Sequence, residues 1–457
     1  MESLQPSATP TVETTALGSA PVTSTERITA IDTLRGFALL GILLMNIIGF
    51  SMYLTAYDNP TVTGGATGPN LAVWAVLHVL AEGKMRCLFS LVFGASVILL
   101  TARLEKTGEA ADIYYRRTIW LGLFGIAHAY LLWVGDILYP YALCGLLLYP
   151  FRKMSAKGLL TLGSVFLLMT AAAYVLDGFS QKERIQKARA AQAAAARGEK
   201  LTEEQQEQKE DYERNEKKRL PDAAALQKDA AKWRGSVLDV IKVRASLIGK
   251  FHSSPYYSSF NWDIWSMMFI GMGLMKLGVL AGRSSIRTYA WMAIAGYAIG
   301  LPVNIYTAYL IIRSNFDPLV QTFTASTYDL GRLSVALGHL GIIMLICKTK
   351  TMQWLTNSLG AVGQMALSNY IMHSIVCAFI FTGYGLAMYG RLQRYQVYYV
   401  VAAIWIFQMI VSPIWLRHFR FGPLEWGWRS LTYWKKQPMR RLQPGDPAKE
   451  IAGEASA

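Results

Sequence analysis

His128 and Asp136 are the two residues of this chain whose types and spacing best suit chemistry. They lie in the stretch GIAHAYLLWVGDILYPYALCGLLLYPF, which carries no other histidine, carboxylate, lysine or arginine. Ionisable groups at membrane depth are costly, so they usually face a bundle interior or a wet cavity. A histidine can take the proton of a hydroxyl or amine, and a carboxylate can orient it. The pair therefore predicts a polar pocket with His128 as general base and Asp136 in its lining.

The spacing of the pair argues against direct contact between the two side chains. On one straight helix, positions 128 and 136 are about 12 Å apart, and a turn at Gly135 would shorten this only modestly. We therefore expect no hydrogen bond between them. Asp136 could instead bind a substrate, pair with Arg86 or cap the following helix. For His128, the structural alternative is a hydrogen bond to a neighbouring helix.

The composition indicates an all-α fold, a polytopic helical bundle in a membrane. Apolar residues make up 53% of the 457, and charged residues only 16%, against about 25% in soluble domains. A span needs roughly 20 mostly apolar residues, which predicts about ten spans and an interfacial helix at 70–82. The spans are expected at 36–54, 85–102, 118–134, 137–151, 159–177, 262–281, 287–311, 332–348, 361–385 and 397–416. We find no internal repeat and no sign of broken, symmetry-related helices.

Charge divides the chain into regions. The net charge is +15, and most Lys and Arg between spans fall on one side, which predicts that both termini are cytoplasmic. Membrane lipids are the expected partners, and nucleic acid is not. Four cysteines in apolar segments indicate core packing, and no metal site is expected.

The predicted regions are a disordered tail at 1–26, a membrane half at 27–177, a charged, helical periplasmic insert at 178–251, a second membrane half at 252–434 with an interfacial aromatic helix, and a disordered basic tail at 435–457.

The first span carries a polar stripe. In RITAIDTLRGFALLGILLMNIIGF, Asp32 and Arg35 lie about 60° apart on a helix and can pair. Asn46 returns to within about 20° of the same face, roughly 16 Å from Arg35 along the axis. The stripe predicts that Asn46 lines the site and that Arg35 lies toward the cytoplasm. The structural alternative is an arginine that reaches the interface, with Asn46 as an interhelical contact.

Five segments resemble the YeiB-like bacterial inner-membrane proteins, whose C-terminal part is a domain of unknown function. They are IDTLRGFALLGILLMNI, KMRCLFSLVFG, GIAHAYLLWVGDILYPYAL, GQMALSNYIMHS and SPIWLRHFRFGPLEWGWRSLTY. The family is grouped with transmembrane acyltransferases, including the lysosomal heparan-α-glucosaminide acetyltransferase and bacterial surface-polysaccharide O-acyltransferases. The resemblance implies acyl-coenzyme A as donor and a glycan, lipid or small molecule as extracytoplasmic acceptor. In the lysosomal enzyme an Asn matches Asn46 and a functional His follows about eleven residues later, where this chain has Tyr57.

We therefore expect a transmembrane acyltransferase with His128, Asp136 and Asn46 at the catalytic site. His78, in the interfacial helix, is another possible base. Arg35, Arg116 and Arg117 lie at the cytoplasmic rim and could bind coenzyme A phosphates. A small-solute transporter or channel, or a non-catalytic scaffold that uses the insert to dock a partner, would account for the same features. The sequence leaves the oligomeric state open.

Overall fold

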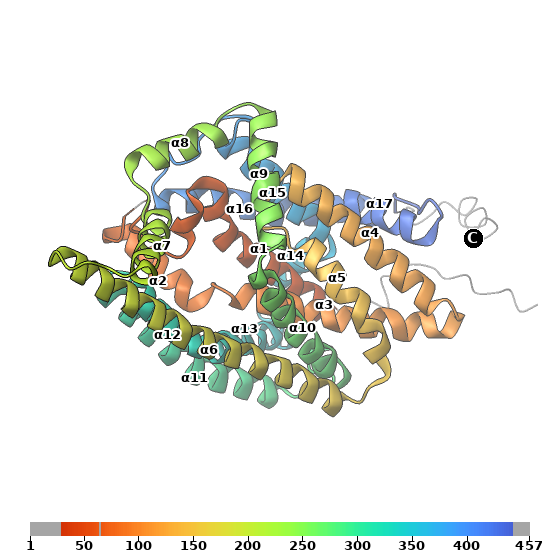
Figure 1. Cartoon of the computed structure of the whole chain (residues 1–457). Helices are drawn as coiled ribbons and strands as arrows, with labels where there is room; N and C mark the ends of the chain where they lie inside the picture. Colours follow the sequence, from red (N-terminus) through yellow and green to blue (C-terminus); the bar gives the residue numbers. More distant parts are fainter. Residues whose placement is uncertain (1–28, 64, 442–457) are drawn as a thin grey trace, which may run out of the picture.

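The computed structural model describes residues 29–63 and 65–441, and these form an all-helical bundle (Figure 1). Within the described residues, extended pairing is limited to one isolated bridge between Phe419 and Arg440. The all-α expectation is confirmed. The tail predicted at 1–26 lies outside the described residues, as does the part from 442 onward of the tail predicted at 435–457.

Every range expected to span the membrane falls on a helix. The bundle helices are α1 (Thr29–Ser51), α3 (Lys84–Leu104), α4 (Ala110–Leu131), α5 (Leu138–Leu148), α6 (Ala156–Ala196), α10 (Pro255–Lys276), α11 (Ile286–Arg313), α13 (Tyr328–Thr349), α14 (Gln353–Gln364), α15 (Ala366–Phe381) and α16 (Arg394–His418). The shorter helices are α2 (Gly68–Leu80), α7 (Glu203–Arg219), α8 (Ala223–Trp233), α9 (Val237–His252), α12 (Pro318–Thr324) and α17 (Pro423–Tyr433), with 3₁₀ turns η1 (Leu54–Tyr57) and η4 (Ala325–Thr327) among the connections.

Length and hydropathy support membrane insertion for part of this set. Among the described residues, six helical segments are long and apolar enough to cross a membrane, or seven if the bent pair α14 and α15 is one span. Helix α5 has only 11 residues, or about 16 Å of length, which is half of a typical hydrocarbon core. The structure therefore supports a membrane bundle, and the number ten stays a prediction.

Two helices are broken, which the sequence analysis did not anticipate. Segments α2 and α3 follow one another as one apolar unit of 40 residues, interrupted at Ala81–Gly83, where Gly83 takes a φ of 70°. Helices α14 and α15 meet at an angle of 82° around Met365. Non-helical backbone at membrane depth is tolerated where it is buried in protein or lines a cavity. The breaks therefore mark places where a site could form.

Helix α1 lies at the centre and is packed closely by glycine contacts. It touches α3, α14, α15 and α16. A Cβ on Gly36 would lie 2.0 Å from the Leu359 carbonyl oxygen, and one on Gly363 would lie 1.9 Å from that of Asp32. Small residues let membrane helices approach at backbone distance. The first helix is therefore packed directly against a helix more than 300 residues away.

The charged insert is helical and rests on the bundle. Helix α6 runs without interruption for 41 residues from the membrane half into the insert. Helix α7 packs against it, and α8 and α9 continue into the upper part of the view in Figure 1. Arg189 pairs with Asp317 at 2.8 Å, and Arg219 donates to the Phe316 carbonyl oxygen at 3.2 Å. The boundary expected at 178 thus falls within one continuous helix.

Candidate active site and polar cavity

His128 and Asp136 form a direct hydrogen bond, contrary to the sequence expectation. Nδ1 of His128 lies 2.7 Å from Oδ1 of Asp136. Helix α4 ends at Leu131, and the chain then turns back, with the Trp133 amide donating to the His128 carbonyl oxygen at 2.9 Å. The straight-helix distance does not apply, because the helix ends between the two residues.

A third residue, Ser374 of α15, completes a chain of hydrogen bonds. Its Oγ lies 2.7 Å from Nε2 of His128. Asp136 is fixed from the other side, because the Tyr139 amide donates to its Oδ2 at 2.8 Å, so the carboxylate also caps α5. Ser374 and His128 are 1% and 2% exposed. We call Ser374, His128 and Asp136 the relay.

The relay has the order of groups that activates a serine hydroxyl. When Asp136 accepts a hydrogen bond from Nδ1–H, the Nε2 of His128 is left to accept from the Ser374 hydroxyl. A nucleophile, its base and a group that orients the base are then in line. Ser374 was not identified from the sequence, because its partner lies 246 positions away.

Two buried donors beside the relay lack partners. Among the described residues, the Tyr370 hydroxyl and the indole Nε1 of Trp133 are buried without a hydrogen bond. The Tyr370 ring lies 5.0 Å from the His128 ring, and Trp133 stacks on Phe50 at 3.8 Å. Buried donors without partners are uncommon. Around a serine nucleophile, such donors could hydrogen bond to the oxygen of an acyl group.

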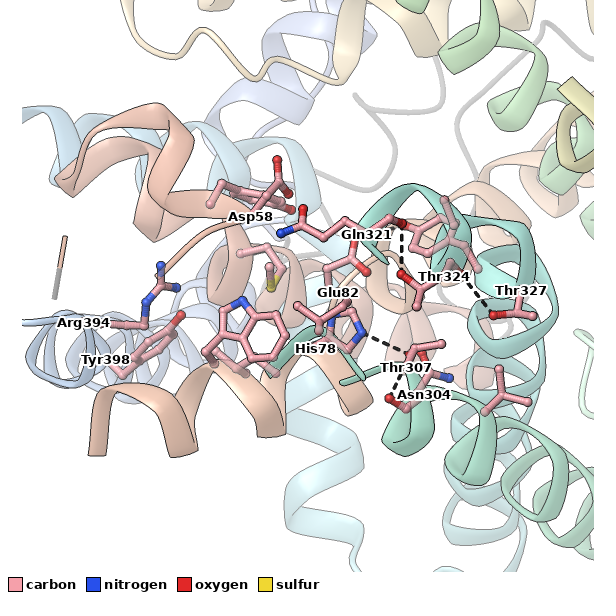
Figure 2. Close-up of a pocket in the computed structure, with 18 residues that line it drawn as sticks. Asp58, His78, Glu82, Asn304, Thr307, Gln321, Thr324, Thr327, Arg394 and Tyr398 are labelled. Atoms are coloured by element: carbon pink, nitrogen blue, oxygen red, sulfur yellow. Dashed lines mark hydrogen bonds between the residues drawn. The ribbon is translucent and has the colours of Figure 1, made fainter. Parts of the chain in front are cut away.

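A polar cavity of about 180 Å³ opens elsewhere in the bundle (Figure 2). Its walls come from the loop after α1, from α2, α11, α12, η4 and the start of α16. The lining includes Asp58, His78, Glu82, Asn304, Thr307, Gln321, Arg394 and Tyr398. Figure 2 shows His78 and Glu82 near its centre. His78, the alternative base of the sequence analysis, thus lines a cavity, whereas His128 is not among the lining residues.

The cavity wall is held by hydrogen bonds around the break between α2 and α3. The Tyr328 hydroxyl donates to Oε1 of Glu82 at 3.0 Å. Lys84, fully buried, donates from Nζ to Oδ1 of Asn304 at 2.7 Å and to the His78 carbonyl oxygen at 2.6 Å. These side-chain bonds add to the backbone hydrogen bonds at the break, such as that from the Lys84 amide to the Ala81 carbonyl oxygen at 3.1 Å.

Asp58 contributes a carboxylate to the cavity whose negative charge no salt bridge neutralises among the described residues. Asp58 borders the cavity, and among the described residues its carboxylate forms no ion pair within 4.0 Å. Desolvation of the carboxylate, and to a lesser extent the charge of Glu82, raise the pKa of Asp58 to about 6, although Arg394 works in the opposite direction. A nearby cation would relieve this repulsion.

Behind the cavity lies a buried group of charges, which we call the ion cluster. Asp263 of α10 binds Arg86 at 2.8 Å and Nη1 of Arg332 at 2.9 Å. Arg332 also binds Asp329 at 2.6 Å. Asp263 and Arg332 are 5% and 1% exposed. The sequence alternative that paired Arg86 with Asp136 is wrong, because Arg86 is held by Asp263.

The remaining predicted site residues lie apart from the relay. Arg35 pairs with Asp32 at 2.5 Å, as expected, and donates to the Gly363 carbonyl oxygen at 3.3 Å. Asn46 is half-buried on α1, next in sequence to Met45, which lines the cavity.

Arg116 and Arg117 of α4, the other two residues predicted to bind the donor, each contact a neighbouring side chain. Arg116 lies 3.6 Å from Asp112, and the Arg117 guanidinium stacks on Trp428 at 3.7 Å. Both are only half-buried. Their roles at a donor site stay predictions.

All four cysteines are free, and three are buried, which confirms that they pack as core residues. Within the described residues, no group of three or more His, Cys, Asp or Glu side chains is placed to hold a metal ion.

Comparison with known proteins places this architecture in a family. A family model described as a protein of unknown function (DUF418) matches residues 274–435. The chain is 30% identical over 440 residues to YxaH of Bacillus subtilis (strain 168), covering 92% of this chain and 98% of that protein. The chain belongs to the YeiB-like family. YeiB of Escherichia coli (strain K12) is 29% identical over 411 residues, covering 89% of this chain and 96% of YeiB.

A further relative, a 39.9 kDa protein in the amylase 3′ region of Bacillus acidopullulyticus, is 27% identical over 428 residues, with 93% of this chain and 99% of that protein covered. No solved structure matches the chain. The matched domain of the YeiB-like family contains Ser374, Asn304 and Arg332, whereas His128 and Asp136 lie outside it. The relay therefore joins the matched domain to the N-terminal part of the chain.

Proposed function

We propose that this chain is a transmembrane acyltransferase in which the relay carries the reaction. The observation that supports this is the hydrogen-bonded line from Ser374 through His128 to Asp136, with both distances at 2.7 Å. In enzymes that form acyl intermediates, this order of groups makes a serine nucleophilic near neutral pH.

The proposed first step is attack of the Ser374 oxygen on the thioester carbonyl of an acyl-coenzyme A. As the new ester bond forms, the hydroxyl proton moves to Nε2 of His128, and Asp136 stabilises the resulting imidazolium. The carbon–sulfur bond then breaks, and the proton passes to the leaving thiolate. In the second step, His128 takes the proton of an acceptor hydroxyl or amine, which displaces Ser374 and returns its proton.

Access to the buried serine is proposed from the side of the bundle. Ser374 is 1% exposed, but the next residue on α15, Ile375, is 51% exposed. On α4, Ile126 and Leu131 are 41% and 51% exposed. The relay thus lies about one side chain beneath an apolar outer surface, which an acyl chain dissolved in lipid could enter.

The cytoplasmic donor and the topology remain part of the proposal. Arg35, Arg116 and Arg117 would bind coenzyme A phosphates, for which bidentate arginine contacts are well suited. Asn46 would face the acceptor path. Both termini would lie in the cytoplasm of a bacterial inner membrane, with ten crossings and a glycan, lipid or small molecule as acceptor on the far side.

The test is covalent labelling of the purified protein with radiolabelled acyl-coenzyme A, without added acceptor. We expect one acyl group per chain, located on Ser374 by peptide mass spectrometry. Ser374→Ala abolishes the label, and His128→Gln lowers its rate by at least about 10²-fold, the range for loss of a general base.

Ser412→Ala is the matched control, because Ser412 is equally buried, at 1%, but its Oγ binds Asn369 rather than a histidine. It should label like the wild type. Labelling that persists in Ser374→Ala, or an absence of any acyl adduct on the folded wild type, would overturn the covalent mechanism.

A second candidate function, transport of a small solute, is favoured by the break between α2 and α3. Interrupted helices that carry charges near a central cavity are typical of secondary transporters, and Glu82 and Lys84 lie at this break. Uptake of a solute into liposomes without an acyl donor, unaffected by Ser374→Ala, would favour transport over acyl transfer.

A further inference from the structure

The polar cavity has the chemistry of a binding site that is separate from the relay. Its volume is about 180 Å³, whereas one water needs only about 10–15 Å³ of such space. It therefore has room for a small organic molecule. None of the relay residues is among those that line it.

The charge of the lining is negative. Asp58 and Glu82 contribute two carboxylates, and Arg394 contributes one cation. Arg394 is 2% exposed, and its guanidinium donates to the Ala56 carbonyl oxygen. Among the described residues, neither Asp58 nor Glu82 forms a salt bridge within 4.0 Å. The cavity therefore presents two acids that no direct salt bridge neutralises among the described residues, with Arg394 as the one cation in the lining.

Lys84 is a further positive group near the cavity, whereas Arg86 and Arg332 behind it are paired with Asp263. Nζ of Lys84 donates hydrogen bonds to two neutral oxygens, Oδ1 of Asn304 at 2.7 Å and the His78 carbonyl oxygen at 2.6 Å. It is fully buried and does not line the cavity. It stabilises the break between α2 and α3, and its charge acts on Glu82 rather than on Asp58.

Aromatic rings complete the lining. The rings that border the cavity are those of Tyr57, Trp74, Tyr328 and Tyr398. The centroid of the Trp74 ring lies 5.0 Å from that of His78 and 4.9 Å from that of Phe316. Aromatic faces attract cations, most strongly organic ammonium groups. Carboxylates together with aromatic rings form the combination that recognises such groups.

We propose that this cavity binds a small organic cation, an amine or quaternary ammonium group placed between Asp58 and Glu82 and bordered by the tyrosine and tryptophan rings. An inorganic divalent ion fits less well, because within the described residues no cluster of three metal-ligating side chains exists. The proposal goes beyond the acyl-transfer chemistry of the relay and does not depend on it.

The test is ligand binding by the full-length protein in detergent, followed by thermal shift and calorimetry at pH 7.5. The probes are choline, ethanolamine, sodium chloride at matched ionic strength, and 3,3-dimethylbutanol, the neutral isostere of choline. We expect choline or ethanolamine to raise Tm at concentrations up to about 10 mM, which corresponds to weak millimolar binding or better. The neutral isostere should have no effect.

Two variants locate the site. Asp58→Asn and Glu82→Gln should each weaken binding by about tenfold or more, the usual effect of losing one charged partner. Asp112→Asn, which removes an exposed acid at the start of α4, is the control and should bind like the wild type. Equal shifts with the isostere or with sodium alone, no shift with either amine, or full binding in both cavity variants would overturn the proposal. Acyl labelling of Ser374 is unaffected by any of these outcomes, so the two proposals fail separately.

Discussion

The ion cluster allows a quantitative test of whether water is excluded from the charged groups inside the bundle. Asp263 is 5% exposed and is shared by Arg86 and Arg332. Asp263→Asn keeps the shape of the side chain but leaves two guanidinium groups with less negative charge beside them. Removing one partner from a buried ion pair costs about 3–5 kcal/mol of unfolding free energy.

This cost converts to a measurable change in Tm. With about 2.1 cal/mol/K of unfolding entropy per residue, the 457 residues give roughly 1 kcal/mol for each kelvin. Asp263→Asn should therefore lower Tm by about 3–5 °C, and by more if the helices persist in the unfolded state. The measurement is thermal unfolding of the detergent-solubilised protein followed by tryptophan fluorescence.

A double-mutant cycle and a surface pair provide the controls. Arg332→Gln combined with Asp263→Asn should cost less than the sum of the two single changes, by more than about 1 kcal/mol, because the residues share one interaction. Glu183→Gln breaks the pair of Glu183 and Lys187, which are 67% and 53% exposed, and should leave Tm unchanged within the error of the measurement. A Tm for Asp263→Asn within about 1 °C of wild type would refute the reasoning, because it would mean that water already solvates the cluster.

Three further predictions concern the cavity, the packing and the topology. Binding of an amine should weaken about tenfold from pH 7 to pH 5 and lose that dependence in Asp58→Asn, because the pKa of Asp58 lies at about 6 and only its ionised form attracts a cation. The groups that face Asp58 are Tyr57, His78, Glu82, Arg394 and Tyr398, so His78→Gln serves as the control titration. Since the folded pKa lies above the usual 3.8, Asp58 stabilises the fold only when protonated, and this contribution is lost as the pH rises from about 4 to about 6. Gly36→Ala should lower Tm by several degrees, because its Cβ would meet the Leu359 carbonyl oxygen at 2.0 Å, whereas Gly427→Ala, with open space around it, should be neutral or slightly stabilising. An impermeant maleimide should label Glu199→Cys in intact cells but Lys106→Cys only after lysis; the reverse pattern would invert the proposed topology.

The sequence predicts the helices well because their signal is local. Each expected span overlaps a helix, although that at 361–385 crosses the bend between α14 and α15, and the charged insert is helical, since apolar length and charge composition are properties of short windows. The sequence also selects His128 and Asp136 as a pair. It assigns them the wrong distance, because the end of α4 at Leu131 is set by tertiary packing rather than by a strong local stop signal.

The residues that were missed depend on contacts between distant segments. Ser374 looks like an ordinary interhelical serine until α15 is placed beside α4. The acids of the cavity were missed because Asp58 and Glu82 lie outside the predicted spans and meet only when the loop after α1 folds over α2. A signal was present for the ion cluster, because Asp263 and Arg332 fall within ranges predicted to cross the membrane, where charges are costly and commonly functional.

The unbroken length of α6 gives the insert a mechanical link to the membrane interior. Forty-one residues make a rod of about 62 Å, roughly twice the thickness of a hydrocarbon core. Its inner half contacts α10 closely, where a Cβ on Gly163 would lie 2.8 Å from the Ser266 carbonyl oxygen, one turn from Asp263. A partner protein that tilted the outer end of α6 would thus also displace its inner end against α10. The displacement would reach the ion cluster without any ligand entering the bilayer.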